Sequence, residues 1–207
     1  MGRTRQIIFV TGTDTGVGKT IFAAVLTREL RSKGVCVAAL KPVCAGDRDD
    51  ARLARAAADN GLSLAEVNPW HFRAALAPLL AARREKKRVR RRDVLAHVRR
   101  VAKRFDVVVV EGAGGLLSPL GENFDSRDLI IALEARPVIV CPNKLGAVNQ
   151  VLLVLAALPK KIAARAGVVL VEQPKPDRAS RTNRELLAEK IGAKRIVLLP
   201  WLGRRAK

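Results

Sequence analysis

The chain has 207 residues, 49% of them hydrophobic, which suits one compact domain with a sizeable core. No apolar run is long enough to cross a bilayer, and residues 1–6 lead into a predicted strand instead of a signal peptide. The three cysteines, Cys36, Cys44 and Cys141, have neither metal-ligand nor disulfide spacing. These features argue against membrane-spanning and disulfide-bonded secreted classes, and we expect a cytoplasmic protein with reduced thiols.

The net charge is +20 and the isoelectric point is about 11.2. Residues 83–104 carry twelve lysines and arginines against two carboxylates, a local excess of ten that is half of the total. Such a segment is either a patch for nucleic acid or another anionic surface, or the solvated face of a helix. Val94, Val98 and Val101 recur at helical spacing within it, and aromatic residues make up only 3% of the chain. We therefore predict an amphipathic helix and expect no nucleic-acid partner.

A glycine-rich stretch lies between two apolar runs, residues 7–10 and residues 21–26. Its members are Gly12, Thr13, Asp14, Thr15, Gly16, Val17, Gly18, Lys19 and Thr20. A strand, a glycine-rich turn and a helix start in this order are typical of a loop whose backbone N–H groups bind phosphates. Lys19 is expected to reach the β- and γ-phosphates of a nucleotide, and Thr20 to offer its hydroxyl to Mg²⁺. The spacing from Gly12 to Gly18 is one residue longer than in the common Gly-x-x-x-x-Gly-Lys-Thr pattern.

A second predicted strand, residues 35–40, delivers Lys41-Pro42-Val43 to its carboxyl end. Ligands bind at this edge in open parallel sheets, so Lys41 is a candidate contact. Three aspartates, Asp47, Asp49 and Asp50, precede a helix predicted over residues 51–60 and are candidates for metal ligation or helix capping. Residues 68–78 are interpreted as an irregular connection along the same edge.

Four consecutive valines, residues 107–110, form the least ambiguous predicted strand. The strand runs into Glu111, Gly112, Ala113, Gly114 and Gly115. A carboxylate at the end of a buried strand is costly unless a cation pairs with it, and Mg²⁺ would meet this need at Glu111. The glycines either let the backbone approach phosphates closely or form a simple tight turn.

Strands and helices alternate through the rest of the chain. Strands are predicted over residues 137–141, 166–171 and 196–200, and helices over residues 129–133, 143–158 and 180–191. Alternation of this kind implies right-handed crossovers between parallel strands. We predict an α/β fold, a single-domain P-loop NTPase over residues 1–207, with a mostly parallel sheet covered by helices on both faces.

These motifs resemble those of dethiobiotin synthetases. The matching pieces are the extended loop of residues 12–20, Lys41-Pro42-Val43, Asp50, Glu111-Gly112-Ala113-Gly114-Gly115, Lys144-Leu145-Gly146 and Pro200-Trp201-Leu202. They fall in family order over nearly the whole chain. The resemblance implies an enzyme that uses ATP and Mg²⁺ to convert 7,8-diaminopelargonate and CO₂ into dethiobiotin, ADP and phosphate in biotin synthesis.

The resemblance also implies roles for individual residues. Lys19, Lys41 and Thr15 would act on the reacting carbamate and phosphate, and Thr20, Asp50 and Glu111 would be metal ligands. Nucleotide contacts would come from residues 12–20 and from Glu111, Gly112, Ala113, Gly114, Gly115, Pro200, Trp201 and Leu202. The substrate would be held by Lys41 and, across a homodimer, by Leu145, Gly146, Ala147, Val148 and Asn149 of the neighbouring subunit.

An alternative interpretation is a partner- or DNA-regulated ATPase of the chromosome-partitioning kind, which shares the broader fold and often has a basic surface. The loop of such proteins usually carries a second lysine near its start, which is missing from Gly12-Thr13-Asp14. A related amide-forming ligase usually carries a glutamine-hydrolysing domain, for which this chain has no room. The fold alone does not separate these functions, so the choice depends on the site residues.

Overall fold

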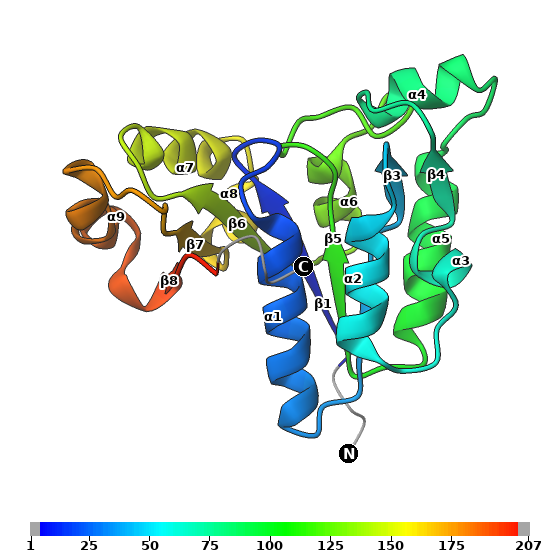
Figure 1. The fold of residues 1–207 in the computed structure, drawn as a ribbon, viewed down its shortest axis with the longest axis horizontal. Helices are drawn as coiled ribbons and strands as arrows, with labels where there is room; N and C mark the ends of the chain where they lie inside the picture. Colours follow the sequence, from blue (N-terminus) through cyan, green and yellow to red (C-terminus); the bar gives the residue numbers. More distant parts are fainter. Residues whose placement is uncertain (1–4, 203–207) are drawn as a thin grey trace.

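The computed structural model describes residues 5–202, so the predicted domain limits of 1–207 extend past the described residues at both ends. Six strands form one sheet in the order β2-β5-β1-β6-β7-β8, and every neighbouring pair is parallel. The strands are β1 (Gln6–Gly12), β2 (Val37–Leu40), β5 (Val107–Glu111), β6 (Arg136–Pro142), β7 (Gly167–Val171) and β8 (Ile196–Leu199). Figure 1 shows helices on both sides of this sheet, which confirms the predicted fold class.

The helices connect these strands and agree with the predicted ones within a few residues at most ends. They are α1 (Lys19–Ser32), α2 (Asp49–Ala58), α3 (Leu64–Val67), α4 (Pro78–Arg84), α5 (Arg91–Ala102), α6 (Ser126–Ala132), α7 (Ala147–Ala156), α8 (Lys160–Ala164) and α9 (Asn183–Ile191), with short 3₁₀ turns at Ala179–Arg181 and Ala193–Arg195. The short helices α3, α4 and α8 were not predicted, because segments of four to seven residues show too little of the helical period.

Successive residues of each central strand pack on opposite faces of the sheet. Val10 of β1 belongs to a core cluster with Phe22 of α1, whereas its neighbour Phe9 belongs to a second cluster that includes residues of α5 and α6. Leu170 of β7 packs in a third cluster with residues of α7 and α9. Burial on both faces explains why these strands are near-continuous runs of Val, Ile and Leu.

A second, two-stranded sheet lies beside the ligand edge. Strand β3 (Val43–Ala45) pairs in parallel with β4 (Trp70–Phe72), directly after Lys41 and Pro42. The interpretation of residues 68–78 as wholly irregular is therefore wrong. A three-residue strand carries no readable period of two, and its partner is distant in sequence, so no local pattern indicates the pairing.

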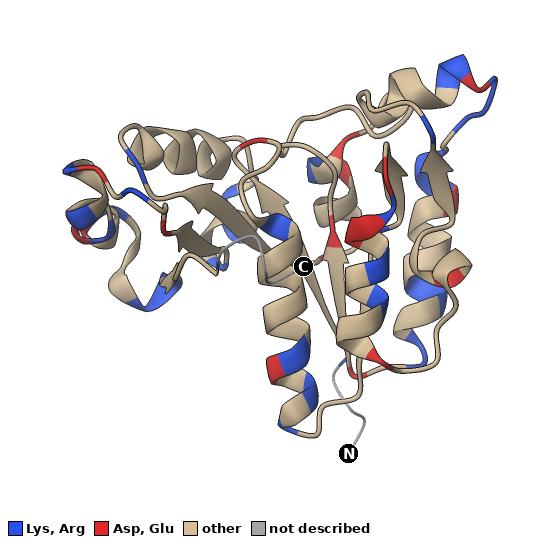
Figure 2. Cartoon of the chain, viewed as in Figure 1, with Lys and Arg blue, Asp and Glu red and all other residues tan. Residues whose placement is uncertain are grey.

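The basic segment of residues 83–104 is divided between the end of α4, a connection and the whole of α5. Val94, Val98 and Val101 of α5 are buried, whereas its arginines are exposed, which confirms the predicted amphipathic helix. Figure 2 shows Lys and Arg along α5 and at the end of α4. The apolar face of α5 is sufficient to explain its packing against the core. The basic side chains of α5 therefore play no part in that packing and face solvent.

His97, on the buried side of α5, makes stability depend on pH. Its Nε2 lies 2.8 Å from the Glu66 carbonyl oxygen, and its Nδ1 lies 3.0 Å from a guanidinium nitrogen of Arg100. A guanidinium only donates, so Nδ1 accepts and the ring is neutral. Burial lowers the pKa of His97 below its usual value, with the charge of Arg100 acting in the same direction.

We expect the free energy of unfolding to fall as the pH drops below about 6.5, because His97 is then protonated in the unfolded chain but stays neutral in the folded protein. The slope contributed by one such proton is at most about 1.4 kcal/mol per pH unit. Denaturant unfolding at pH 7.5 and pH 5.5 measures it. The variant His97→Gln keeps a donor and an acceptor but does not titrate, so it is expected to lose less stability on acidification. An equal loss in both proteins would contradict this assignment.

Candidate active site

The phosphate-loop residues lie at the carboxyl end of β1, in the interior of the sheet. Strand β1 pairs with β5 on one side and β6 on the other, and the chain leaves β1 toward β2 before it later crosses to β6. A crevice outside the strand ends forms where the strand order reverses in this way. The ends of β2 and β5, which carry Lys41 and Glu111, open at the same edge.

The glycines of the loop are required by its shape. Gly16 and Gly18 have φ angles of +72° and +98°, which residues with a side chain rarely adopt. At Gly12 an added Cβ would lie 2.7 Å from Val17 Cγ2, so that position has no space for a side chain. Helix α1 begins at Lys19 with no side-chain cap, which leaves its first backbone N–H groups available to an anion. This geometry agrees with the predicted phosphate loop.

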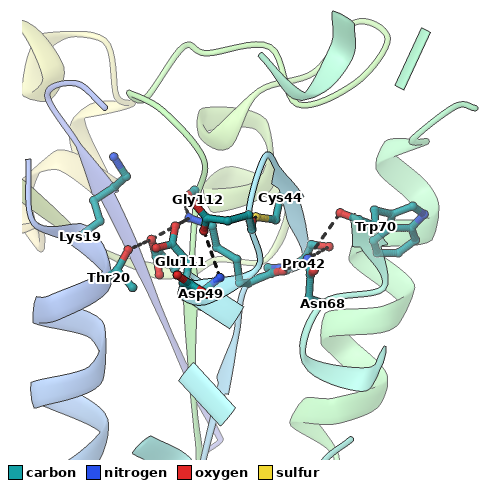
Figure 3. A network of polar contacts seen from close by, with 12 residues as sticks. Lys19, Thr20, Pro42, Cys44, Asp49, Asn68, Trp70, Glu111 and Gly112 are labelled. Atoms are coloured by element: carbon teal, nitrogen blue, oxygen red, sulfur yellow. Dashed lines mark hydrogen bonds and ion pairs between the residues drawn. The ribbon is translucent and has the colours of Figure 1, made fainter. Parts of the chain in front are cut away.

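Lys19 is buried and turned toward the loop. Its Nζ donates a hydrogen bond to the Asp14 carbonyl oxygen at 2.6 Å. Burial, reinforced by the charge of Lys41, lowers the pKa of Lys19 to about 8. In Figure 3 the Lys19 side chain points away from Glu111. An anion that entered the loop would meet a cation that is poorly solvated and therefore strongly attracted to it.

Lys41 is held by three oxygens. Its Nζ lies 2.7 Å from Glu111 Oε1, 2.9 Å from the Gly112 carbonyl oxygen and 3.1 Å from Asp50 Oδ2. Burial opposes the charge of Lys41, but the Glu111 and Asp50 carboxylates outweigh it and raise the pKa of Lys41 above its usual value. Burial likewise disfavours the charged Asp50 carboxylate. Lys41 outweighs this effect and keeps the pKa of Asp50 below its usual value. The ion pair is therefore fully charged at neutral pH.

The three predicted metal ligands lie together, and their chemistry fits Mg²⁺. Thr20 Oγ1 donates to Glu111 Oε1 at 2.8 Å, and both residues line the same cavity as Asp50. Glu111 Oε2 is buried without a hydrogen-bond partner in the described structure, an arrangement that a cation would relieve. Hydroxyl and carboxylate oxygens are the ligands that Mg²⁺ prefers. Residues 5–202 contain no group of three or more His, Cys, Asp and Glu side chains placed to hold a metal ion, so phosphate oxygens and water would have to complete the coordination.

The glycine-rich turn after β5 lies against the phosphate loop. A Cβ on Gly115 would lie 3.4 Å from the Thr13 carbonyl oxygen. The Gly115 N–H donates to Ser118 Oγ at 2.8 Å, and Gly114 has a φ angle of +70°. Ser118 also lines the cavity, and sequence reasoning missed its role. The only local signal was a hydroxyl residue three positions after a glycine pair.

Asn68 is a second residue that sequence reasoning missed. Its side-chain nitrogen donates to the Lys41 carbonyl oxygen at 2.7 Å, and its side-chain oxygen accepts from Arg48 Nε at 3.0 Å. Figure 3 shows Asn68 beside Pro42, with a longer contact to Trp70. Asn68 therefore fixes the backbone that carries Lys41. This contact depends on the pairing of β3 with β4, which the sequence did not indicate.

One cavity of about 1070 Å³ is lined by ten of the predicted site residues. The predicted residues that line it are Thr15, Gly16, Gly18, Lys19, Thr20, Lys41, Asp50, Glu111, Ala113 and Gly114. Its other wall comes from α2 and residues 75–78, where Leu53, Leu76 and Pro78 are apolar and Asp49 and Arg52 of α2 are charged. A cavity with cations at one end and apolar side chains at the other suits a ligand that is part phosphate and part hydrocarbon.

Gly12, Thr13, Asp14, Val17, Gly112 and Gly115 belong to the same two loops but do not line the cavity. Among the residues that the structure describes, two further groups of predicted residues lie outside it. Pro200, Trp201 and Leu202 follow β8, where Trp201 is 49% exposed. The segment Leu145, Gly146, Ala147, Val148 and Asn149 lies at the start of α7, and Leu145 is 79% exposed. Asp177 accepts a hydrogen bond from the Leu145 N–H at 2.7 Å and holds this segment in place. Within one chain Leu145, Gly146 and Asn149 are therefore exposed, whereas Ala147 is buried.

The chain matches known proteins over nearly its whole length. The family model described as AAA domain covers residues 6–205. An ATP-dependent dethiobiotin synthetase BioD of Akkermansia muciniphila is 38% identical, over 87% of this chain and 85% of that protein. The protein of the same name from Anaeromyxobacter dehalogenans is 39% identical, over 97% of this chain and 93% of its own length.

A solved structure agrees with the fold alone. The signal recognition particle receptor FtsY from Elizabethkingia anophelis matches with a TM-score of 0.50 and 17% identity, over all of this chain and 61% of that one. None of the helices within residues 5–202 combines the length and hydropathy needed to cross a bilayer. Because curated relatives match at this identity over most of their length, the chain belongs to the ATP-dependent dethiobiotin synthetase family.

Proposed function

We propose that the chain closes the ureido ring of dethiobiotin from 7,8-diaminopelargonate and CO₂, with ATP converted to ADP and phosphate. The observation that carries this proposal is the convergence of Lys19 and Lys41 on one cavity that is also lined by apolar side chains. The cations suit phosphate and carbamate, and the apolar side chains suit the hydrocarbon chain of the diamine. The assignment of one such domain to residues 1–207 and a cytoplasmic location are part of the same proposal.

The difficulty of this reaction is electrostatic. A carbamate formed on one amine of the substrate must use its oxygen to attack the γ-phosphorus of ATP, and both groups are anionic. Fixed cations at the point of approach lower this barrier without reorganisation during the reaction. Lys19 is placed by the phosphate loop, and Lys41 is placed by the end of β2. Thr15, which also lines the cavity, offers a hydroxyl donor beside them.

Attack on the γ-phosphorus would release ADP and leave a carbamic–phosphoric anhydride. The second amine would then attack the carbonyl carbon and expel phosphate, which closes the ring. Lys41 would stabilise the anionic oxygen of the carbamate, and Lys19 the phosphate oxygens. Mg²⁺, held by Thr20, Asp50 and Glu111, would neutralise phosphate charge when it is bound.

A homodimer is part of the proposal because the site needs a group for the substrate carboxylate. Residues 145–149 include the N-terminus of α7 and do not line the cavity of their own chain. A helix N-terminus favours an anion, and two exposed leucines provide apolar surface nearby, Leu145 just before α7 and Leu153 within it. A two-fold pairing could place this segment of one subunit at the cavity of the other.

Phosphate release is the direct test. The protein is incubated with ATP, Mg²⁺ and bicarbonate, with and without 7,8-diaminopelargonate, and products are identified by mass spectrometry. The expected result is phosphate release that requires the diamine and equals the dethiobiotin formed. Release that ignores the diamine but rises with duplex DNA would instead favour the partitioning-type ATPase.

The basic surface of α5 supplies a control for that alternative. Reversal of the charge of two exposed residues, Arg91→Glu with Arg92→Glu, is expected to leave diamine-dependent phosphate release within about twofold of the unaltered protein, because neither residue lines the cavity. Steady-state rates of the two proteins at the same ionic strength measure this. A loss of tenfold or more would show that the surface takes part in the reaction.

A further inference from the structure

The Lys41 ammonium has no donor left for a ligand. An ammonium carries three N–H donors, and Lys41 has three acceptors within 3.1 Å: Glu111 Oε1, Asp50 Oδ2 and the Gly112 carbonyl oxygen. Its side chain is 4% exposed. To contact a carbamate or phosphate oxygen, as the proposed function requires, Lys41 must first give up at least one of these bonds.

The two acceptor side chains are also the carboxylates that the proposed function assigns to the metal. Thr20 Oγ1, the third proposed metal ligand, donates to Glu111 Oε1, the same oxygen that Lys41 contacts. The ammonium therefore occupies one oxygen of each carboxylate, Glu111 Oε1 and Asp50 Oδ2, and Glu111 Oε2 stays buried without a partner within residues 5–202. A bound metal and an ammonium within hydrogen-bond distance of one carboxylate oxygen would repel each other.

Lys19 differs from Lys41 in this respect. Among the described residues its ammonium has one hydrogen-bond partner, the Asp14 carbonyl oxygen, and no carboxylate lies within ion-pair distance. Figure 3 shows its side chain directed away from Glu111. Lys19 can thus receive phosphate oxygens without any other ion pair breaking.

We propose that Lys41 and a divalent cation are alternative occupants of the Glu111–Asp50 carboxylate pair, so that Lys41 becomes available to the reacting groups only after the cation has replaced it. This inference rests on the proposed function. In the nucleotide-free protein, Lys41 neutralises the two carboxylates and keeps cations out. Nucleotide phosphates, which bind first to the loop and Lys19, then provide a new counter-ion for Lys41 as the metal takes its place.

Mn²⁺ binding in the absence of nucleotide tests the exchange without any turnover. Free Mn²⁺ is measured by its electron paramagnetic resonance signal during titration of the unaltered protein, Lys41→Met and Lys41→Gln. Both variants are expected to bind Mn²⁺ at least about tenfold more tightly, because the competing cation is gone. The Gln variant retains an amide that can donate to Glu111, so it is the one more certain to fold. Circular dichroism identifies the folded variants.

Lys19→Met is the matched control. It removes a positive charge from the same cavity but no hydrogen bond to either carboxylate, so its Mn²⁺ affinity is expected to rise clearly less than that of the Lys41 variants. An equal gain in Lys19→Met and Lys41→Gln would show that general charge, and not occupancy, limits metal binding. Unchanged affinity in a folded Lys41 variant would also overturn the inference.

A measurement on the unaltered protein avoids the possibility that a variant fails to fold. With [¹⁵N]lysine labelling, a buried ammonium bonded on three sides is expected to give a slowly exchanging resonance in the nucleotide-free protein. The signal should persist on addition of a non-hydrolysable ATP analogue alone and shift when Mg²⁺ is added with the analogue. A signal unmoved by both additions would contradict the exchange. Neither test uses the diamine, so the exchange and the proposed function can fail separately. If the Lys41 variants bind Mn²⁺ more tightly but the unaltered protein shows no diamine-dependent phosphate release, only the proposed function is refuted. If phosphate release depends on the diamine but Mn²⁺ affinity is unchanged in the variants, only the exchange is refuted.

Discussion

Replacement of Lys41 by alanine is expected to lower diamine-dependent phosphate release by about 10²-fold to 10³-fold, the usual effect of removing one fixed donor from a developing anion. Nucleotide binding is expected to remain within a few-fold of normal, because Lys19 is hydrogen-bonded within the loop, to the Asp14 carbonyl oxygen, and the loop backbone does not depend on Lys41 for its position. Steady-state phosphate release and equilibrium binding of a fluorescent nucleotide measure the two quantities separately.

The matched control for this variant is Lys33→Ala. Lys33 follows the last turn of α1 and pairs with the exposed Glu29, so its loss should change neither rate nor affinity. Near-normal turnover in Lys41→Ala would remove Lys41 from the reaction. Loss of nucleotide binding together with turnover would mean that Lys41 organises the whole cavity and does not act on the reacting groups specifically.

The second large effect is expected for Glu111→Gln. The amide oxygen still accepts from Lys41 and Thr20, but the negative charge that would hold a divalent cation is gone. We expect the Mg²⁺ concentration for half-maximal phosphate release to rise at least about tenfold. The reason is that the buried site loses one of the two negative charges that would attract the metal. The free energy of unfolding should fall by about 3 kcal/mol, because a buried Lys41 keeps only the half-exposed Asp50 as a counter-ion.

Glu122→Gln serves as the control, since Glu122 makes an exposed ion pair with Arg83 and should influence neither quantity by more than about 1 kcal/mol or twofold. Magnesium titrations of the rate and denaturant unfolding of both variants provide the comparison. An unchanged Mg²⁺ requirement in a folded Glu111→Gln protein would exclude Glu111 as a metal ligand.

Local sequence was sufficient for the phosphate loop and for the sheet that carries it. Gly12, Gly16 and Gly18 are dictated by positive φ angles or by lack of space, and these are properties of a few adjacent residues. The strands are readable for a similar reason. Burial on both faces demands near-continuous apolar runs, and the run of valines in β5 meets that demand without reference to any distant residue.

Only the tertiary structure decided how the charged residues meet. The sequence placed Lys41, Asp50 and Glu111 at strand or helix ends, but it did not indicate that both carboxylates lie within 3.1 Å of the Lys41 ammonium. That contact depends on β2 lying beside β5, a pairing of segments 70 residues apart for Lys41 and Glu111. The roles of Asn68 and Ser118, and the pairing of β3 with β4, have the same origin. Polar contacts between remote segments cannot be predicted from the spacing of apolar residues. That spacing indicates which face of one helix or strand is buried, but not which distant segment packs against it.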